Sequence, residues 1–243
     1  MLRGPDGILL VTPVWHDSAR LGPFGRELAE ALADSSMPVT WIVADDGSGD
    51  AECRRIQALA ESYRETFPHV HAHFAETHRG KGAVVREAWS LAPQAAWFAF
   101  VDADGSIPAQ DLVGLLNVAT REGRSVIGIR RRTATTVLEE HPFRAMTHRL
   151  FLTLARAMLD LRSQDIQCGA KVIRGEDYRR IAARLEEPGL AFDSELLATL
   201  AHNGVTWTEV PVNWREKSGG RVKPLRHAWR MIGALLRVRR KLR

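Results

Sequence analysis

The sequence predicts an α/β protein with a mainly parallel sheet that helices cover on both faces. Short apolar runs typical of buried strands alternate with amphipathic stretches whose apolar residues recur at helical spacing. The 243 residues are enough for one large α/β domain, and 45% hydrophobic with 26% charged residues is ordinary for a globular chain. No run of about 18 apolar residues is present, so the sequence predicts no membrane-spanning helix.

The first half of the chain gives the clearer pattern. The run Ile8–Val14 lacks the length and cleavage pattern of a signal peptide and predicts the first strand. Apolar residues at helical spacing over 21–32 predict a helix after it. The remaining elements expected in this half are strands at 39–44, 70–74, 97–101 and 125–129, and helices at 51–65, 82–91 and 109–120.

The second half is less regular, and we expect fewer elements there. They are helices at 143–161 and 193–202, and strands at 171–174 and 206–210. Ser-Gly-Gly at 218–220 predicts a flexible joint.

The net charge of +5 is unevenly distributed. The segment 217–243 carries 10 Lys and Arg and no acidic residue, which leaves 24 basic and 29 acidic side chains in the rest. A mildly acidic body with a basic tail argues against nucleic acid as a partner. Cys53 and Cys168 are far apart and lack metal-ligand spacing, which predicts a reducing compartment and no structural zinc.

Acidic residues directly follow two of the predicted strands. Asp45 and Asp46 end the second, and Asp102 and Asp104 end the fourth. Ligands of parallel sheets bind beyond these carboxyl ends, and adjacent carboxylates repel unless a cation lies between them. This pattern favours Mg²⁺ or Mn²⁺ completed by substrate phosphate oxygens, although Asp-Gly sequences also form ordinary turns.

A glycine-rich turn precedes the helix expected at 82–91. His78-Arg79-Gly80-Lys81-Gly82 is neither a P-loop nor a dinucleotide fingerprint. Lys81 beside a helix N-terminus is suited to a phosphate, and the alternative is a solvated surface lysine.

Five motifs occur in a fixed order: DDGS, GKG, VDADGS, DIQCGAKVIR and FDSELL followed by EVPVNW. Together they resemble the inverting family 2 glycosyltransferases, and within that family the branch that uses dolichyl or polyprenyl phosphates. The resemblance implies a GT-A fold, a nucleotide-diphosphate sugar donor with UDP-glucose as the leading candidate, Mg²⁺ or Mn²⁺, and a polyprenyl-phosphate acceptor. It also implies one catalytic domain over 1–216, with a nucleotide-sugar half over about 1–131 and an acceptor half over about 132–216.

The resemblance also assigns residues to the donor. Asp46 would hold the base or ribose with Asp45 beside it, Lys81 would face the diphosphate, and Asp104 would be the direct metal ligand. Asp102 would reach the metal or the ribose, in part through water. The other implied donor-binding residues are Pro13, Trp15, Arg130 and Arg131.

Carboxylates in two motifs are candidates for the catalytic base near the acceptor. They are Asp165 in DIQCG and the pair Asp193 and Glu195 in FDSEL, of which Asp165 and Asp193 are the leading choices. A phosphate acceptor is already anionic, so positioning matters more than a base. Asp193 has a structural alternative as the N-cap of the following helix.

The tail 225–243 has apolar residues at helical spacing, including Trp229, Ile232 and Leu235, with arginines between them. This predicts a basic amphipathic helix on an anionic membrane surface, which would place the protein in the cytoplasm at the inner membrane face. The alternative is a helix packed on the body with a solvated basic end.

Two other functions fit part of the pattern. A non-catalytic nucleotide-sugar-binding or scaffold protein would use the same fold, because fold alone does not guarantee activity. A nucleotidyltransferase would also use strand-end aspartates and a metal, but it leaves the DIQCG and FDSEL motifs unexplained.

Overall fold

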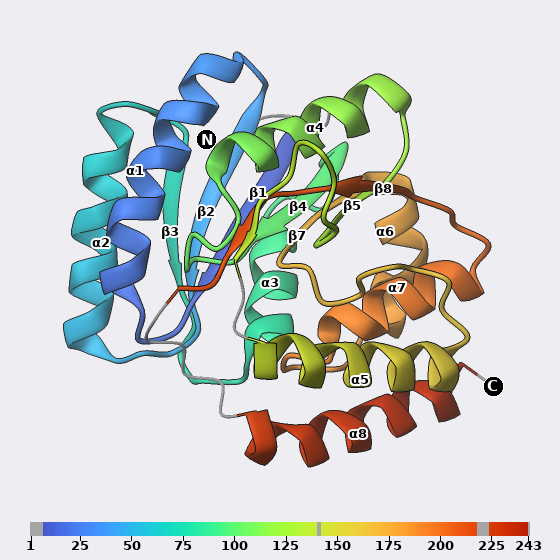
Figure 1. Cartoon of the computed structure of the whole chain (residues 1–243). Coiled ribbons are helices and arrows are strands. Elements are labelled where there is room, and N and C mark those ends of the chain that lie inside the picture. Colours follow the sequence, from blue (N-terminus) through green and yellow to red (C-terminus); the bar gives the residue numbers. More distant parts are fainter. Residues whose placement is uncertain (1–6, 140–141, 218–223, 243) are drawn as a thin grey trace.

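The computed structural model describes residues 7–139, 142–217 and 224–242. These residues form a seven-stranded sheet flanked by helices (Figure 1). The strand order is β3-β2-β1-β4-β7-β5-β8. The strands are β1 Ile8–Val14, β2 Val39–Asp45, β3 Val70–Phe74, β4 Trp97–Val101, β5 Val126–Ile129, β7 Ala170–Arg174 and β8 Thr208–Pro211. A separate two-stranded sheet pairs β6 Leu138–Glu139 with β9 Trp214–Arg215.

Helices cover both faces of the large sheet (Figure 1). One core packs against α1 Ser18–Ser35, α2 Asp50–Arg64 and α4 Ala109–Glu122. The other face packs against α3 Lys81–Trp89, α5 Pro142–Leu159, α6 Gly175–Ile181, α7 Phe192–His202 and α8 Pro224–Lys241. A 3-10 turn, Ala182–Arg184, follows α6. The expected α/β class with a covered, mainly parallel sheet is confirmed.

The alternation of side chains along β4 shows how one strand serves two cores. Ala99 and Val101 enter the core under α1, α2 and α4, whereas Phe98 and Phe100 enter the other. Successive side chains of a strand point to opposite faces, so a continuous apolar run is what a doubly covered strand requires. Trp89 of α3 lies against both phenylalanine rings and is fully buried.

One strand of the large sheet runs against the others. Strand β7 is antiparallel to both of its neighbours, β4 and β5, while every other pairing is parallel. The start of β7 therefore lies beside the end of β4, and the Asp102 amide donates to the Gly169 carbonyl at 2.9 Å. This reversal brings the DIQCG segment to the edge of the sheet where the DADG segment begins.

Several short elements were not expected from the sequence. Strands β6 and β9 have two residues each and α6 has seven, which is too short for a periodic pattern. Pro211 was expected to follow the last strand, but it lies within β8 as its final residue.

Helix α8 packs against α5 and α7, with Ala234, Leu235 and Val238 buried. This is the packed arrangement that the sequence left open as an alternative for the tail. The expected joint at 218–220 and the side chain of Trp229 lie outside the described residues.

Candidate active site

A cavity of about 530 Å³ lies at the carboxyl ends of β1, β2 and β4. Parallel strands leave their last backbone groups and side chains at this edge, which is where open α/β sheets bind ligands. Of the residues expected to bind the donor or metal, the cavity brings together Pro13, Trp15, Asp46, Lys81, Asp102 and Asp104.

Asp46 fixes the turn that begins α3. Its carboxylate accepts hydrogen bonds from the amides of Arg79 at 2.9 Å and Gly80 at 2.7 Å, and it pairs with His78 Nδ1 at 2.8 Å. Gly80 has φ +114°, and a Cβ there would lie 2.6 Å from the Pro188 carbonyl oxygen. A residue with a side chain would therefore be strained and would clash.

Asp45 points away from the cavity and is fully buried at the end of β2. Its Oδ2 accepts from the Ser48 amide at 2.9 Å, while Oδ1 has no hydrogen-bond partner among the described residues. The structure therefore separates the two aspartates of the DDGS motif.

Trp15 provides an open aromatic surface in the cavity. Its ring stacks on His78 with centroids 4.1 Å apart and an interplanar angle of 16°, and the residue remains 39% exposed. Because His78 is also held by Asp46, the stack has a fixed orientation. A planar ligand can therefore stack on it.

Lys81 lies at the back of the cavity, between two carboxylates. Its Nζ is 2.8 Å from Asp102 and 3.0 Å from Asp193, and its side chain is only 12% exposed. Burial alone would lower the pKa of Lys81, but the two carboxylates outweigh it, so the pKa is raised and the lysine is charged. The expected alternative, a solvated lysine, is wrong.

Asp193 belongs to a buried chain of alternating charges. It also accepts from Lys171 Nζ at 2.5 Å, and Lys171, which is fully buried, donates further to the Cys168 carbonyl at 2.7 Å. Burial raises the pKa of Asp193, but Lys171 and Lys81 lower it further than burial raises it. The N-cap interpretation is wrong, because α7 begins at Phe192 and has no side-chain cap.

Asp102 and Asp104 lie at one side of the cavity. Desolvation raises the pKa of Asp102, and the charges of Asp104 and Asp193 add to this rise while Lys81 opposes it. Asp104 accepts from the Ser106 amide at 2.9 Å, and its other oxygen lies 3.6 Å from Arg20 Nη1.

These two carboxylates fit a divalent metal whose coordination a substrate completes. Both line an open cavity, and hard carboxylate oxygens are ligands that Mg²⁺ and Mn²⁺ prefer. Within the described residues, no three His, Cys, Asp or Glu side chains are grouped to hold a metal by themselves.

Asp165 and Arg130 form a separate site outside this cavity. The guanidinium donates to both carboxylate oxygens, at 2.7 and 3.0 Å, and the Arg130 amide adds a bond of 3.1 Å. Asp165 is 2% exposed. Arg131 is exposed and donates to Gln164 Oε1 at 3.3 Å. The structure therefore does not bring Asp165, Arg130 or Arg131 to the other predicted residues.

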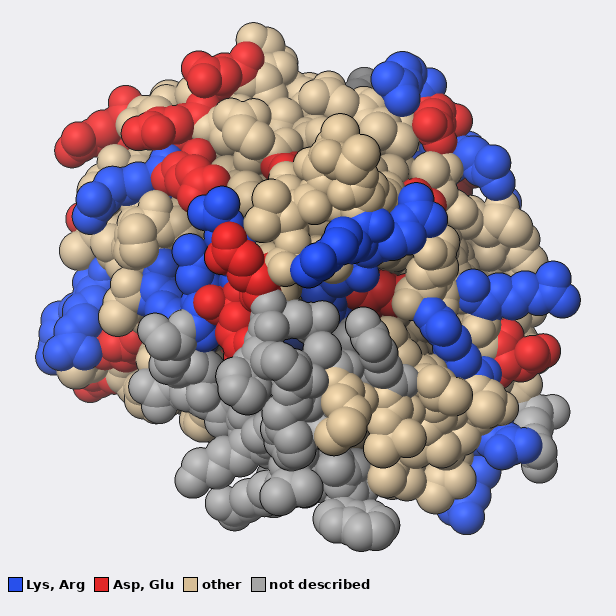
Figure 2. Space-filling view, in the orientation of Figure 1, with Lys and Arg blue, Asp and Glu red and all other residues tan. Residues whose placement is uncertain are grey.

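Several cavity residues were missed from the sequence. Arg20 of α1 lies 3.6 Å from Asp104, and Met231, Ala234 and Arg237 of α8 also line the cavity. Lys171 was missed as a partner of Asp193, although a lysine among the buried residues of a short strand is a usable signal. At the centre of the view in Figure 2, acidic and basic side chains lie next to one another.

Comparison with known families decides the class of protein. The model of glycosyl transferase family 2 matches residues 11–182. The chain belongs to glycosyl transferase family 2. It is therefore a glycosyltransferase, as the order of its motifs predicted, and the nucleotidyltransferase and non-catalytic alternatives are set aside.

Individual relatives agree with this assignment. The dolichyl-phosphate beta-glucosyltransferase of Dictyostelium discoideum is 26% identical over 96% of this chain and 75% of its own length. The polyprenol monophosphomannose synthase of Mycolicibacterium smegmatis is 27% identical over 90% of this chain and 81% of its own length.

A solved structure shares the fold. Glucosyl-3-phosphoglycerate synthase from Mycobacterium tuberculosis, in complex with Mn²⁺, uridine diphosphate and glucosyl-3-phosphoglycerate, aligns over 96% of this chain and 80% of its own with a TM-score of 0.63 and 19% identity. The expected GT-A fold is confirmed. Within the described part of the chain, no helix is long and apolar enough to cross a membrane.

Proposed function

We propose that this family 2 glycosyltransferase moves glucose from UDP-glucose to a polyprenyl phosphate, with inversion at the anomeric carbon. The observation that carries the proposal is the single cavity in which an exposed tryptophan, a charged lysine and two strand-end carboxylates meet. Relatives named for dolichyl-phosphate glucosylation and polyprenol phosphomannose synthesis support the lipid phosphate acceptor.

The donor would lie along the first four strands. Trp15, which lines the cavity together with Pro13, would stack on the base, and Asp46 would hold the base or ribose through the turn that it already fixes. Lys81 would face the diphosphate, because it is the charged group at the back of this part of the cavity. Arg130 and Arg131 lie outside this cavity, paired with Asp165 and Gln164, so the proposal gives them no contact with the donor.

Asp104 and Asp102 would hold Mg²⁺ or Mn²⁺. When bound, the ion would neutralise the charge that develops on the departing diphosphate. The Mn²⁺ and uridine diphosphate in the structure of glucosyl-3-phosphoglycerate synthase support a divalent ion and a uridine nucleotide.

The acceptor phosphate would attack from the side of the sugar opposite the diphosphate. Since this acceptor is already an anion, no carboxylate has to remove a proton, and the protein's task is to position the two substrates. This agrees with the location of Asp165 and Asp193, whose carboxylates are buried in ion pairs.

The lipid acceptor would enter the active site from a membrane surface to which the protein binds. Helix α5 exposes Met146, Leu150 and Leu154 at four-residue spacing, and Leu236 of the neighbouring α8 is 42% exposed. Together with the basic end of α8, this exposed apolar surface favours binding to an anionic inner membrane face.

A transfer assay tests the donor, metal and acceptor separately. Labelled UDP-glucose and GDP-mannose are each incubated with a short polyprenyl phosphate, with Mn²⁺, Mg²⁺ or a chelator. We expect labelled lipid from UDP-glucose, lost with the chelator. Preference for GDP-mannose would overturn the donor assignment, and turnover in chelator would overturn the metal. If uridine diphosphate raises the melting temperature but no lipid is labelled, the acceptor assignment is wrong.

A further inference from the structure

Helix α8 supplies part of the cavity wall although it lies far along the chain. Met231, Ala234 and Arg237 line the cavity, together with Leu190 from the segment 185–191. The family model ends at residue 182, so this wall comes from a part of the chain that the family match does not include.

The chemistry of this wall differs from that of the residues at the strand ends. Leu190, Met231 and Ala234 are apolar, and beside them lie the Arg237 guanidinium and the Glu187 carboxylate with which it pairs. The other lining residues include Asp46, Asp102, Asp104, Arg20 and Lys81. An apolar surface beside an arginine suits a ligand with a hydrocarbon body and an anionic group.

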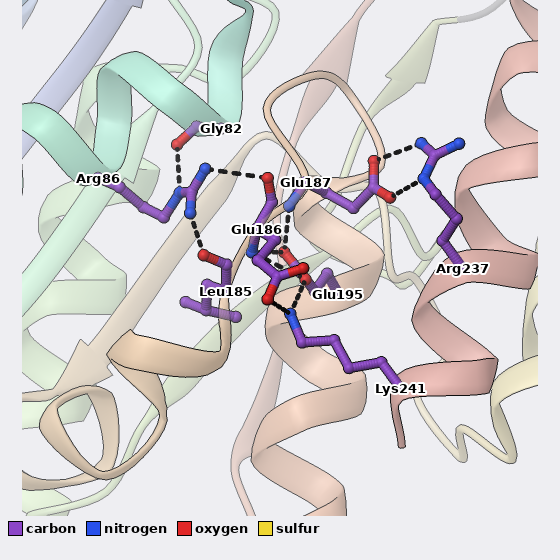
Figure 3. Close-up of polar contacts among 8 residues, drawn as sticks. All are labelled: Gly82, Arg86, Leu185, Glu186, Glu187, Glu195, Arg237 and Lys241. Atoms are coloured by element: carbon purple, nitrogen blue, oxygen red, sulfur yellow. Dashed lines mark hydrogen bonds and ion pairs between the residues drawn. The ribbon is translucent and has the colours of Figure 1, made fainter. Parts of the chain in front are cut away.

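Hydrogen bonds from side chains of two helices hold the first residues of the segment 185–191 in place (Figure 3). Glu195 of α7 accepts hydrogen bonds from the amide of Glu186 at 3.0 Å and from that of Glu187 at 2.8 Å. Arg86 of α3 donates to the carbonyls of Leu185 and Glu186. The segment is thus held by two helices on the same face of the sheet.

Helix α8 is attached to this segment by ion pairs (Figure 3). Arg237 donates from Nε to Glu187 Oε1 and from Nη2 to Glu187 Oε2, both at 2.9 Å. Lys241 adds contacts to Glu186 at 3.0 Å and Glu195 at 3.3 Å. The Glu187 side chain is 9% exposed while that of Arg237 is 63% exposed, so Glu187 is the fixed partner and Arg237 is the group that it orients.

The same segment contacts the start of α3. The Pro188 carbonyl accepts from the Ala83 amide at 3.0 Å and lies directly over Gly80. Glu187 and Pro188 therefore connect α8 with the turn that immediately precedes Lys81.

We propose that the α8 wall is the acceptor subsite and that Glu187 is the positioning residue that orients Arg237 toward the acceptor phosphate. This inference rests on the proposed lipid phosphate acceptor. The hydrocarbon chain lies on Leu190, Met231 and Ala234, and the phosphate lies near Arg237 in the cavity that Trp15 also lines.

The test is the kinetics of Glu187→Gln and Arg237→Gln with UDP-glucose and farnesyl phosphate as the probe. Each variant is expected to raise the acceptor KM about tenfold, since one bidentate ion pair is lost. The donor KM stays within about twofold, which a general structural defect would not produce. The double variant gives no larger change in acceptor KM than the greater single effect, because the two side chains act through one interaction.

Glu176→Gln is the matched control. It removes an exposed ion pair with Arg174, 2.7 Å long, on α6 outside the cavity, and both KM values stay as in the wild type. The inference is overturned if both test variants keep the wild-type acceptor KM, or if their donor KM rises as much as their acceptor KM. Neither result would affect the proposed acceptor itself. Failure of the wild type to transfer sugar to farnesyl phosphate overturns the proposed acceptor and this inference together.

Discussion

Two lysines and two aspartates alternate from the cavity into the core. Asp102, Lys81, Asp193 and Lys171 are joined by contacts of 2.8, 3.0 and 2.5 Å. Charges in a poorly solvated region are tolerated only when each has a partner of opposite sign. The charge on Lys81 is therefore balanced before any ligand arrives, and its position is fixed from both sides.

Removal of the Asp104 carboxylate is expected to reduce catalysis without affecting folding. It is partly exposed, with a side-chain exposure of 27%, and its contacts are to the Ser106 amide and Arg20. We expect Asp104→Ala to reduce sugar transfer by about 10²-fold or more, since charge stabilisation of the transition state is lost. The melting temperature should stay close to that of the wild type. Asp34→Ala, on the exposed side of α1, is the control, and normal turnover in Asp104→Ala would contradict the metal assignment.

Gly169 determines where the Asp102 carboxylate can lie. A Cβ at position 169 would be 2.2 Å from Asp102 Oδ2, so Gly169→Ala must displace that side chain. We expect transfer to fall by about 10²-fold, because catalysis is sensitive to displacements near 1 Å. Gly114→Ala in α4, where a Cβ meets nothing within 4 Å, should keep full activity. Equal activity of the two variants would rule out this role for Gly169.

At the residue scale, apolar runs predicted where the carboxylates lie, and motifs predicted what they bind. The strand-end positions of Asp46, Asp102 and Asp104 followed from apolar runs that stop at Ala44 and Val101, directly before the aspartates. The partners of Asp193 could not be predicted this way, because Lys171 and Lys81 reach it from two other elements. Asp165 shares this difficulty: Arg130 lies 35 positions away in the chain and occupies its carboxylate.

At the scale of elements, the strands of the parallel core were predicted best. β1, β2 and β4 are buried on both faces, so their sequences are mainly apolar, with Thr12, Thr40 and the terminal Asp45 as the polar exceptions. The direction of β7 could not be predicted, since an apolar run has the same composition whichever way it is paired. The packing of α8 also depended on contacts with α5 and α7 that its own amphipathic pattern does not specify.

Lys171 of β7 connects the sheet with α7. Its fully buried ammonium is paired with Asp193, whose side chain is 5% exposed. We expect Lys171→Met to lower the free energy of unfolding by about 3–5 kcal/mol, because it leaves a carboxylate without one of its two cations. Urea denaturation measures this change. Lys217→Met, at an exposed position, should have no measurable effect, and equal stabilities would show that Lys81 alone satisfies Asp193.

The loss of stability at acid pH is a property of the whole molecule. Residues 1–216 carry 29 acidic and 24 basic side chains, so many carboxylates can take up a proton as the pH falls. The pKa of Asp193 lies below its ordinary value of 3.8 in the folded state. The unfolded chain therefore binds this proton more readily, so the stabilisation is complete above about pH 5 and is lost as the pH falls through the folded pKa.

Urea denaturation between pH 6 and pH 3 checks this pH dependence. The free energy of unfolding of the wild type should fall more steeply toward pH 3 than that of Asp193→Asn, which lacks the group that titrates. Parallel curves for the two proteins would show that other carboxylates account for the acid sensitivity.

The insertion of β7 between β4 and β5 has a consequence for synthesis of the chain. Strand β5 ends at Ile129, and its partners among the described strands are β7, which begins at Ala170, and β8, which begins at Thr208. As the chain leaves the ribosome, β5 emerges well before any strand that can pair with it. The four strands β3, β2, β1 and β4 can assemble at once, whereas the other end of the sheet must wait for later residues. The cavity therefore takes its final form only late in synthesis, when β7 and then α8 have emerged.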